Sequence, residues 1–232
     1  MNFSINKQNS VVITDRVQEV MTDFDIKPEH SNESFTGSLE IEDKDWSIGL
    51  IVGGSGTGKS TIAKEVFKDA YVYSYDYDQL SVLDNMPEGR TVNEIEKAFT
   101  SVGFSSPPSW LKPYGVLSTG EKMRVDLAMT LLLDNELIVF DEFTSVVDRE
   151  VAKTCSQAIQ KEIRRSNKRF IAVSCHRDII EYLCPDWIYD TDQKSFFGLR
   201  GCMSSQNTKL TYTKLTDLIS KKSGNYLGSI TI

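Results

Sequence analysis

The sequence predicts an α/β protein with a largely parallel sheet and helices on both faces. Three observations support this fold class. Short apolar runs alternate with helix-length segments in the second half of the chain, which is typical of parallel sheets. A compact apolar run at residues 46–52 leads directly into a group of glycines. Finally, 40% hydrophobic and 25% charged residues over 232 positions are the proportions of a globular protein with one substantial core.

The alternation is regular after residue 118. It predicts helices over residues 119–133, 149–165 and 178–183, and strands over residues 137–140, 170–174 and 187–189. Upstream, the pattern predicts a helix over 59–68, a strand over 71–75, a helix over 91–99 and a loop over 103–115.

The two ends of the chain are less regular. Residues 1–45 mix β-like runs at 11–14 and 38–41 with a helix at 16–22, so we expect an N-terminal β-rich part. Residues 1–193 would form the main domain. The more polar residues 194–232 are expected to be a C-terminal appendage, the stub of a further domain.

Composition also limits location and partners. No run approaches 18 apolar residues, and the N-terminus lacks the apolar segment of a signal peptide, so we expect a cytoplasmic protein without a membrane span. The four cysteines form no CxxC pair and are expected to be reduced and buried. A net charge of −7 does not favour general nucleic-acid binding. One basic stretch is predicted to be a solvated helix end, although a partner surface stays open: Lys161, Arg164, Arg165, Lys168 and Arg169.

A glycine-rich motif provides the strongest signal for chemistry. It fits the phosphate-binding pattern G-x-x-x-x-G-K-[ST] between an apolar strand and a helix, as a P-loop NTPase requires. Glycines let backbone N–H groups turn toward phosphates at a helix N-terminus. Lys59 would reach the β- and γ-phosphates of ATP, Ser60 would ligate Mg²⁺, and Thr61 follows them. The motif consists of Gly53, Gly54, Ser55, Gly56, Thr57, Gly58, Lys59 and Ser60.

An acidic pair, Asp141 and Glu142, follows the apolar run Leu137–Phe140. Ligands of parallel sheets bind at the carboxyl ends of strands, so Asp141 is expected to face the magnesium held by Ser60. Glu142 could take a proton from an attacking water. Without the glycine motif, an ordinary surface loop would explain the pair equally well.

Between these motifs, Ser118 begins a predicted helix and Glu121 stands three positions later. This spacing fits a capping box, in which the two side chains bond each other's backbone N–H groups. The same helix start, with Gly120 and free N–H groups, could also bind a phosphate.

The order of these motifs resembles that of ABC-type ATPases over residues 46–190. Residues 118–121 look like the family signature, residues 145–148 like its D-loop, and His176 like its switch histidine. The resemblance implies an ABC-type fold with a short helical subdomain and an ATP-dependent homodimer. It further implies that Ser118 and Gly120 meet the γ-phosphate of the partner's ATP, that His176 contacts it within one chain, and that Asp148 helps set the interface.

Several positions depart from the family pattern. Thr119, Glu121 and Phe143 stand where a glycine, a glutamine and a proline are usual, and Lys59 and Ser118 are only 59 positions apart. That short span argues against a transporter subunit. Gln79 is a weak candidate for the glutamine loop. The adenine-stacking aromatic is open among Phe24, Phe35 and Trp46, each of which could equally be a core residue.

A narrower resemblance rests on residues 110–114, 141–149 and 174–176. These phrases look like a soluble ABC-type subgroup found with acetyltransferase-like domains, often in phage or mobile elements. The resemblance suggests an acetyltransferase-like or other protein partner, although residues 194–232 are too few to fold as that enzyme.

These observations favour a soluble ABC-type ATPase that hydrolyses Mg-ATP in a nucleotide-sandwiched homodimer to drive a partner protein or a nucleic-acid transaction. Its catalytic residues would be Glu142, His176 and Lys59. Three alternatives stay open: the nucleotide-binding subunit of an ABC transporter, a P-loop small-molecule kinase, and a scaffold in which ATP only holds the dimer together.

Overall fold

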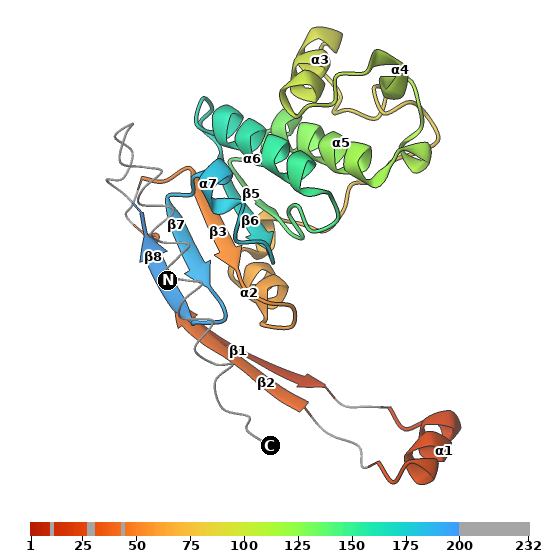
Figure 1. Cartoon of the computed structure of the whole chain (residues 1–232), viewed down its shortest axis with the longest axis vertical. Coiled ribbons are helices and arrows are strands. Elements are labelled where there is room, and N and C mark those ends of the chain that lie inside the picture. The colour runs from red at the N-terminus through yellow and green to blue at the C-terminus, as the bar shows by residue number, and fades with distance from the viewer. Residues whose placement is uncertain (10–11, 27–30, 43–44, 200–232) are drawn as a thin grey trace.

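The computed structural model describes residues 1–9, 12–26, 31–42 and 45–199, which build a central sheet, its covering helices and a projecting hairpin (Figure 1). The sheet has six strands in the order β4-β5-β6-β3-β7-β8. All are parallel except β8, which pairs antiparallel with β7. The strands are β3 (Ile48–Val52), β4 (Tyr71–Val72), β5 (Leu137–Phe140), β6 (Arg169–Ser174), β7 (Trp187–Asp190) and β8 (Ser195–Gly198).

Both faces of the sheet are buried, which explains why its strands are nearly continuous apolar runs. Leu50 and Val52 of β3 belong to the core cluster that contains side chains of α5 (Thr119–Leu132), α6 (Arg149–Ile163) and α7 (Ile180–Leu183). Ile51 points to the opposite face, where it packs with Ile62 of α2 (Lys59–Val66). The predicted α/β fold class, with helices on both faces, is therefore confirmed.

The chain between β4 and β5 forms the expected short helical subdomain. It contains α3 (Val92–Ser101), the single turn α4 (Pro107–Trp110) and a 3₁₀ turn at Tyr114–Val116 before α5 begins. Thr91 caps α3 through a capping box with Glu94. Buried Phe99 packs against Phe104 and Trp110 and holds the subdomain together.

The N-terminal part is an arm. Strands β1 (Asn2–Asn9) and β2 (Ser31–Ser38) pair antiparallel, and α1 (Asp15–Asp23) lies at the far end of this hairpin (Figure 1). The predicted helix over 16–22 is confirmed. The predicted strands over 11–14 and 38–41 are misplaced: residues 12–14 and 39–41 form no strand, residue 38 ends β2, and residue 11 lies outside the described residues. The strands that do pair are mostly polar and carry little apolar signal. Leu39 and Ile41, which suggested a strand, are instead core residues beyond the end of β2.

Three other boundaries differ from the predictions. Strand β4 ends at Val72, and beyond it the hydroxyl of Tyr75 bonds Thr130 of α5. The expected loop over 103–115 contains α4. A 3₁₀ turn, Lys68–Ala70, separates α2 from β4. Strand β8 lies beyond residue 193 yet completes the main sheet, so the sheet extends into the expected appendage. The remainder of that appendage, 200–232, is outside the described residues.

Candidate nucleotide-binding site

The P-loop occupies the turn between β3 and α2, as the motif predicts. Gly56 and Gly58 have φ values of 79° and 87°, in the left-handed region that glycine adopts without strain. At Gly58 a Cβ atom would also lie 2.2 Å from the ring of Phe35. Phe35 belongs to β2, so the arm packs directly against the phosphate-binding turn and glycine is required there.

Lys59 is buried, and its ammonium donates a hydrogen bond of 2.6 Å to the backbone carbonyl of Gly54. Lys59 thus folds over its own loop, where the ammonium is within reach of a phosphate group. A cavity of about 240 Å³ opens beside it. That cavity is lined by Glu33, Phe35, Ser55, Gly56, Gly58, Lys59, Ser60, Thr61 and Glu142. The residues present fit a phosphate chain with a magnesium ion, since they combine N–H donors, an ammonium, hydroxyls and two carboxylates.

The acidic pair forms a tight turn after β5. Phe143 is fully buried, and its N–H donates to the carbonyl of Val173 at 2.8 Å. Glu142 and Thr144 have φ values of 51° and 65°, which are costly for residues with side chains and occur mainly where a site demands them. With Phe143 buried in the sheet, the exposed side chain of Glu142 reaches the P-loop cavity.

Asp141 lies differently. Its carboxylate accepts a short hydrogen bond from the hydroxyl of Tyr71, at the end of β4. Burial, followed by this contact with Asp141, raises the pKa of Tyr71 well above its ordinary value, so the phenol remains a donor. Asp141 and Glu142 both line a second cavity of about 620 Å³, which reaches Thr119 of α5. The predicted metal role of Asp141 with Ser60 stays a prediction.

His176 follows β6, which lies between β5 and β3 in the sheet. This order places His176 between the acidic turn and the P-loop, because the carboxyl ends of parallel strands share one edge. The backbone N–H of His176 donates a hydrogen bond to the hydroxyl of Ser174 at 3.1 Å. Its Nδ1 is buried and has no hydrogen-bond partner among the described residues.

The start of α5 satisfies the capping-box prediction. The Ser118 hydroxyl donates to the Glu121 carboxylate at 2.8 Å and accepts from the Glu121 N–H at 3.4 Å. These bonds leave the N–H groups of Thr119 and Gly120 without intrahelical partners. Ser118 and Thr119 are exposed. Asp148 caps α6 in a similar way, accepting from the Val151 N–H at 2.9 Å.

Two groups of polar residues at this edge escaped the sequence analysis. Asp126 of α5 accepts hydrogen bonds from the hydroxyls of Tyr77 and Tyr114, at 2.8 and 2.9 Å. Tyrosine at every second position from 71 to 77 was the available signal. The other group joins Arg177 to Asp190 and Asp192 beside the P-loop, and no pattern in the sequence indicated it.

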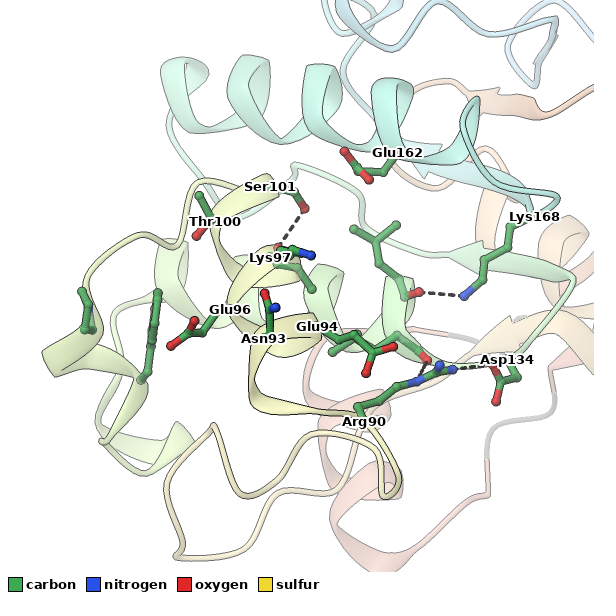
Figure 2. A pocket seen from close by; sticks show the side chains of 15 residues that line it. Arg90, Asn93, Glu94, Glu96, Lys97, Thr100, Ser101, Asp134, Glu162 and Lys168 are labelled. Carbon is green, nitrogen blue, oxygen red and sulfur yellow. Dashed lines mark hydrogen bonds and ion pairs between the residues drawn. The ribbon is translucent and has the colours of Figure 1, made fainter.

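A larger cavity, of about 950 Å³, lies away from these motifs, between α3 and the ends of α5 and α6 (Figure 2). Its basic residues serve the fold. Lys168 donates to the carbonyl oxygens of Leu131 and Leu133, and Arg90 donates to that of Leu132 at 2.9 Å. They satisfy the last carbonyl groups of α5, as cations near a helix C-terminus do. This cavity therefore belongs to the scaffold.

The other sequence candidates have ordinary roles. Trp46 is buried against Trp187, whereas Phe24 is 72% exposed and is not a core residue, so of the three aromatic candidates Phe35 alone lines the P-loop cavity. In the basic stretch, Arg164 pairs with Asp186. Cys155, Cys175 and Cys184 are free, and Cys202 lies outside the described residues. Gln79 forms no described hydrogen bond and lines neither cavity of the nucleotide edge.

The described residues contain neither a membrane-spanning helix nor a preformed metal cluster. None of their helices has the length and apolarity needed to cross a membrane. No cluster of three or more histidine, cysteine or acidic side chains is arranged there to hold a metal ion. A magnesium ion at this site would therefore depend on the nucleotide and on few protein ligands, which is usual for Mg²⁺ with substrate phosphates.

Comparison with solved structures identifies the fold. The chain superposes on the dimeric structure of MJ0796, a bacterial ABC transporter cassette, with a TM-score of 0.58 and 17% identity, covering 73% of this chain and 93% of the cassette. A post-hydrolysis state of MJ0796 bound to ADP and Pi gives the same TM-score at 15% identity, covering 86% of this chain and 100% of that chain. The chain thus has the fold of an ABC-type nucleotide-binding cassette.

Sequence comparison agrees, although no family model matches. The energy-dependent translational throttle protein EttA of Mycobacterium tuberculosis is 27% identical over 164 residues, 58% of this chain and 29% of EttA. The energy-coupling factor transporter ATP-binding protein EcfA1 of Leuconostoc mesenteroides is 26% identical over 188 residues, 64% of this chain and 68% of EcfA1. The chain thus spans less than a third of EttA. These similarities support an ABC-type nucleotide-binding domain.

Proposed function

We propose that this chain is an ATPase that hydrolyses Mg-ATP between two copies of itself, as a soluble protein that drives a partner protein or a nucleic-acid transaction. The observation that carries the proposal is the P-loop cavity. Glu142, presented by a strained turn after β5, lines the same cavity as Lys59 and Ser60. A base beside a phosphate site is the arrangement that hydrolysis of a phosphoanhydride needs.

The P-loop residues bind the phosphates. Lys59 exchanges its bond to the Gly54 carbonyl for the β- and γ-phosphate oxygens, while the N–H groups at the start of α2 point at the same anion. Ser60, with Asp141, would hold the magnesium ion, which neutralises charge on the phosphates when bound. Phe35, against Gly58, is placed to stack on the adenine ring, and we assign it that role.

Glu142 positions the attacking water and takes its proton. His176, between the acidic turn and the P-loop, would donate a hydrogen bond to the γ-phosphate. Both residues act where charge changes during the reaction, so their removal should lower turnover more than ATP affinity.

The second copy completes the site. Ser118 and Gly120 begin a helix whose first N–H groups are free and whose surface is exposed, so they suit a phosphate brought by another chain. Asp148, at the exposed start of α6, would lie in the same interface. Solved cassettes with this fold are dimeric, which supports this assembly.

The test is a Glu142→Gln variant. It keeps the size of the side chain and removes the base, so we expect turnover to fall by about 10²–10⁴-fold with ATP affinity retained. Size-exclusion chromatography with Mg-ATP should show an accumulated dimer. Glu136→Gln, at the other end of β5 and exposed, is the matched control and should behave as the wild type. A Glu142→Gln protein that hydrolyses ATP at the wild-type rate contradicts the proposal.

A transporter subunit is the second candidate, because the match to EcfA1 covers 68% of that transporter ATP-binding protein. The Glu142→Gln dimer distinguishes the two functions when used as bait. Recovery of an integral membrane protein supports the transporter, whereas recovery of a soluble protein or RNA supports our proposal.

The remaining sequence hypotheses have separate readouts. Transfer of the γ-phosphate to an added metabolite would indicate a kinase, and negligible wild-type hydrolysis with ATP-dependent dimers would indicate a scaffold. The acetyltransferase-like partner and the phage association stay predictions, and the bait experiment tests the partner as well.

A further inference from the structure

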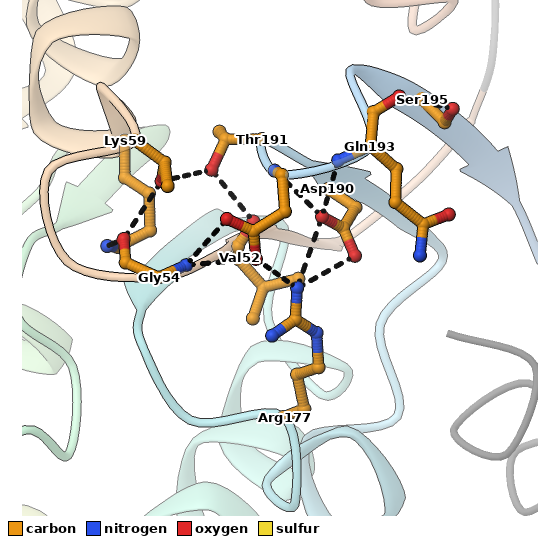
Figure 3. Close-up of polar contacts among 10 residues, drawn as sticks. Val52, Gly54, Lys59, Arg177, Asp190, Thr191, Gln193 and Ser195 are labelled. Carbon is orange, nitrogen blue, oxygen red and sulfur yellow. Dashed lines mark hydrogen bonds and ion pairs between the residues drawn. The ribbon is translucent and has the colours of Figure 1, made fainter. Parts of the chain in front are cut away.

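Three neighbouring strands end at the P-loop edge, and a polar network joins the segments that follow them. Arg177 comes after β6, Gly54 after β3, and Asp190 and Asp192 at the end of β7 and just beyond it. Because β3 lies between β6 and β7, the side chain of Arg177 must extend across the end of β3 to reach these acids (Figure 3).

The contacts of this network are close and partly buried. One terminal nitrogen of Arg177 lies 3.2 and 3.1 Å from the two carboxylate oxygens of Asp190, which is fully buried, and 2.6 Å from Asp192. Asp190 is held further by the N–H groups of Asp192 and Gln193. A charged pair in this setting is far more rigid than a surface ion pair.

The network ends on the P-loop itself. Both carboxylate oxygens of Asp192 accept from the Gly54 N–H, at 3.1 and 3.0 Å. The carbonyl oxygen of Gly54 accepts hydrogen bonds from the Lys59 ammonium and, at 2.9 Å, from the Thr57 hydroxyl. Gly54 is therefore bonded on one side to the phosphate-binding lysine and on the other to the acid that binds Arg177.

Ionisation of the network is consistent with a permanent charge pair. Burial acts to raise the pKa of Asp192, but the hydrogen bonds from Arg177 and from the Gly54 N–H outweigh it and hold that pKa below its usual value. Asp192 is thus an anion at neutral pH, although it lies beside a site for anionic phosphates.

We propose that Arg177 and Asp192 are positioning residues, which fix the loop carrying His176 relative to Gly54 and thereby place His176 against the phosphate that Lys59 binds. Arg177 is the residue next to His176, so its anchorage determines where that loop lies. The inference rests on the proposed role of His176. It adds the residues that give His176 its position, which act through the backbone and do not touch the nucleotide.

The experiment compares two acid-to-amide variants. Asp192→Asn weakens the connection to Arg177 and Gly54. Asp134→Asn, the control, breaks the ion pair of Asp134 with Arg90 beyond the C-terminal end of α5, away from the P-loop and from the loop that carries His176. We expect Asp192→Asn to lower kcat by roughly 10-fold with little change in the Kd for ATP, because small misplacements of reacting groups are costly. Asp134→Asn should keep the wild-type kcat.

Arg177→Met should have the larger effect, roughly 10- to 100-fold in kcat, with partial recovery in Arg177→Lys. Because Arg177→Met leaves buried Asp190 without its cation, its thermal unfolding must be measured first. If it fails to fold, the comparison of Asp192→Asn with Asp134→Asn still decides the proposal, because Asp192→Asn leaves the pairing of Arg177 with Asp190 in place.

A double-variant cycle identifies the route. If Arg177 and Asp192 act through His176, Asp192→Asn should have little further effect on kcat in a His176→Ala background. Full additivity of the two effects overturns the inference, as does a wild-type kcat for Asp192→Asn. If His176→Ala alone leaves kcat unchanged, the proposed role of His176 fails instead, which is a different result.

Discussion

The two glycine-bearing helix starts of this molecule, the P-loop before α2 and the segment before α5, differ in how they are held. The P-loop is bonded to its neighbours on the sheet, through the Asp192 contact with the Gly54 N–H and through the hydroxyls of Thr57 and Thr191, 2.6 Å apart. Ser118 bonds within its own helix, to Glu121 and to the Lys122 N–H, and its side chain is exposed.

This difference indicates which half of a phosphate site each helix start supplies. A site whose loop is fixed by its own chain can bind a nucleotide without help. An exposed helix start whose first N–H groups have no intrahelical partner gains its phosphate ligand only when a second surface closes over it. The contrast is therefore between a complete half-site and one that needs another molecule.

The largest effect should come from removing the P-loop ammonium. Lys59→Ala should weaken ATP binding by at least about 100-fold, since charge-assisted bonds to phosphate are among the strongest available. Isothermal titration calorimetry with Mg-ATP measures this loss. Lys64→Ala, on the same helix but pointing to the rings of Tyr71 and Tyr73, is the control. Wild-type affinity in Lys59→Ala would remove the basis of the site.

An intermediate effect, on ATPase turnover, is expected at the start of α5. A Cβ atom on Gly120 would meet only the Arg124 side chain, at 3.8 Å, so Gly120→Ala fits within one chain and should stabilise α5 by about 0.5–1 kcal/mol. A phosphate approaching from a second chain would meet the added methyl group. We expect ATPase turnover to fall about 10-fold while the affinity of the monomer for ATP stays unchanged.

Gly115→Ala serves as the control for that experiment. Gly115 precedes the same helix, and a Cβ atom there would meet nothing within 4 Å. Steady-state ATPase assays and thermal unfolding of both variants are sufficient. If Gly120→Ala hydrolyses ATP as fast as Gly115→Ala, the start of α5 does not contact the phosphate and the contrast between the two helix starts has no functional meaning.

The smallest effect is on stability and concerns the contacts of α5 with two tyrosines that precede it in the chain, Tyr77 and Tyr114. Burial raises the pKa of Asp126 to about 6, although bonds from Tyr77 and Tyr114 oppose the shift; its ordinary value is 3.8. Between these values the folded state binds more protons than the unfolded state. The contribution of Asp126 to the free energy of unfolding should therefore decrease as pH rises from about 4 to about 6, and stay constant above that.

Urea unfolding across this pH range tests the effect. Relative to Asp126→Asn, which does not titrate, the wild type should lose stability as pH rises from about 4 to about 6. The exposed control Asp69→Asn should run parallel to the wild type. If the stability of Asp126→Asn varies with pH in parallel with that of the wild type, the Asp126 carboxyl does not titrate in this range, which contradicts the prediction.

Much of the sheet could be predicted because its strands are buried on both faces. Leu137–Phe140 is four apolar residues and was located to the residue, as was the start of α5 from its capping box. The arm was misplaced because β1 and β2 satisfy their backbone groups mainly through each other, with polar side chains that carry no pattern. Strand β8 was missed because a short edge strand needs little apolar surface.

The sequence by itself determined the fold class and the identity of the phosphate-binding turn, because local patterns of glycine, apolar period and capping act over a few residues. Only the tertiary structure decided that Phe35 packs on Gly58, that Glu142 shares the cavity of Lys59, and that Arg177 reaches Asp192 across the end of β3. These contacts join residues 15 to 83 positions apart. The order of the strands, which no local pattern encodes, brings them together.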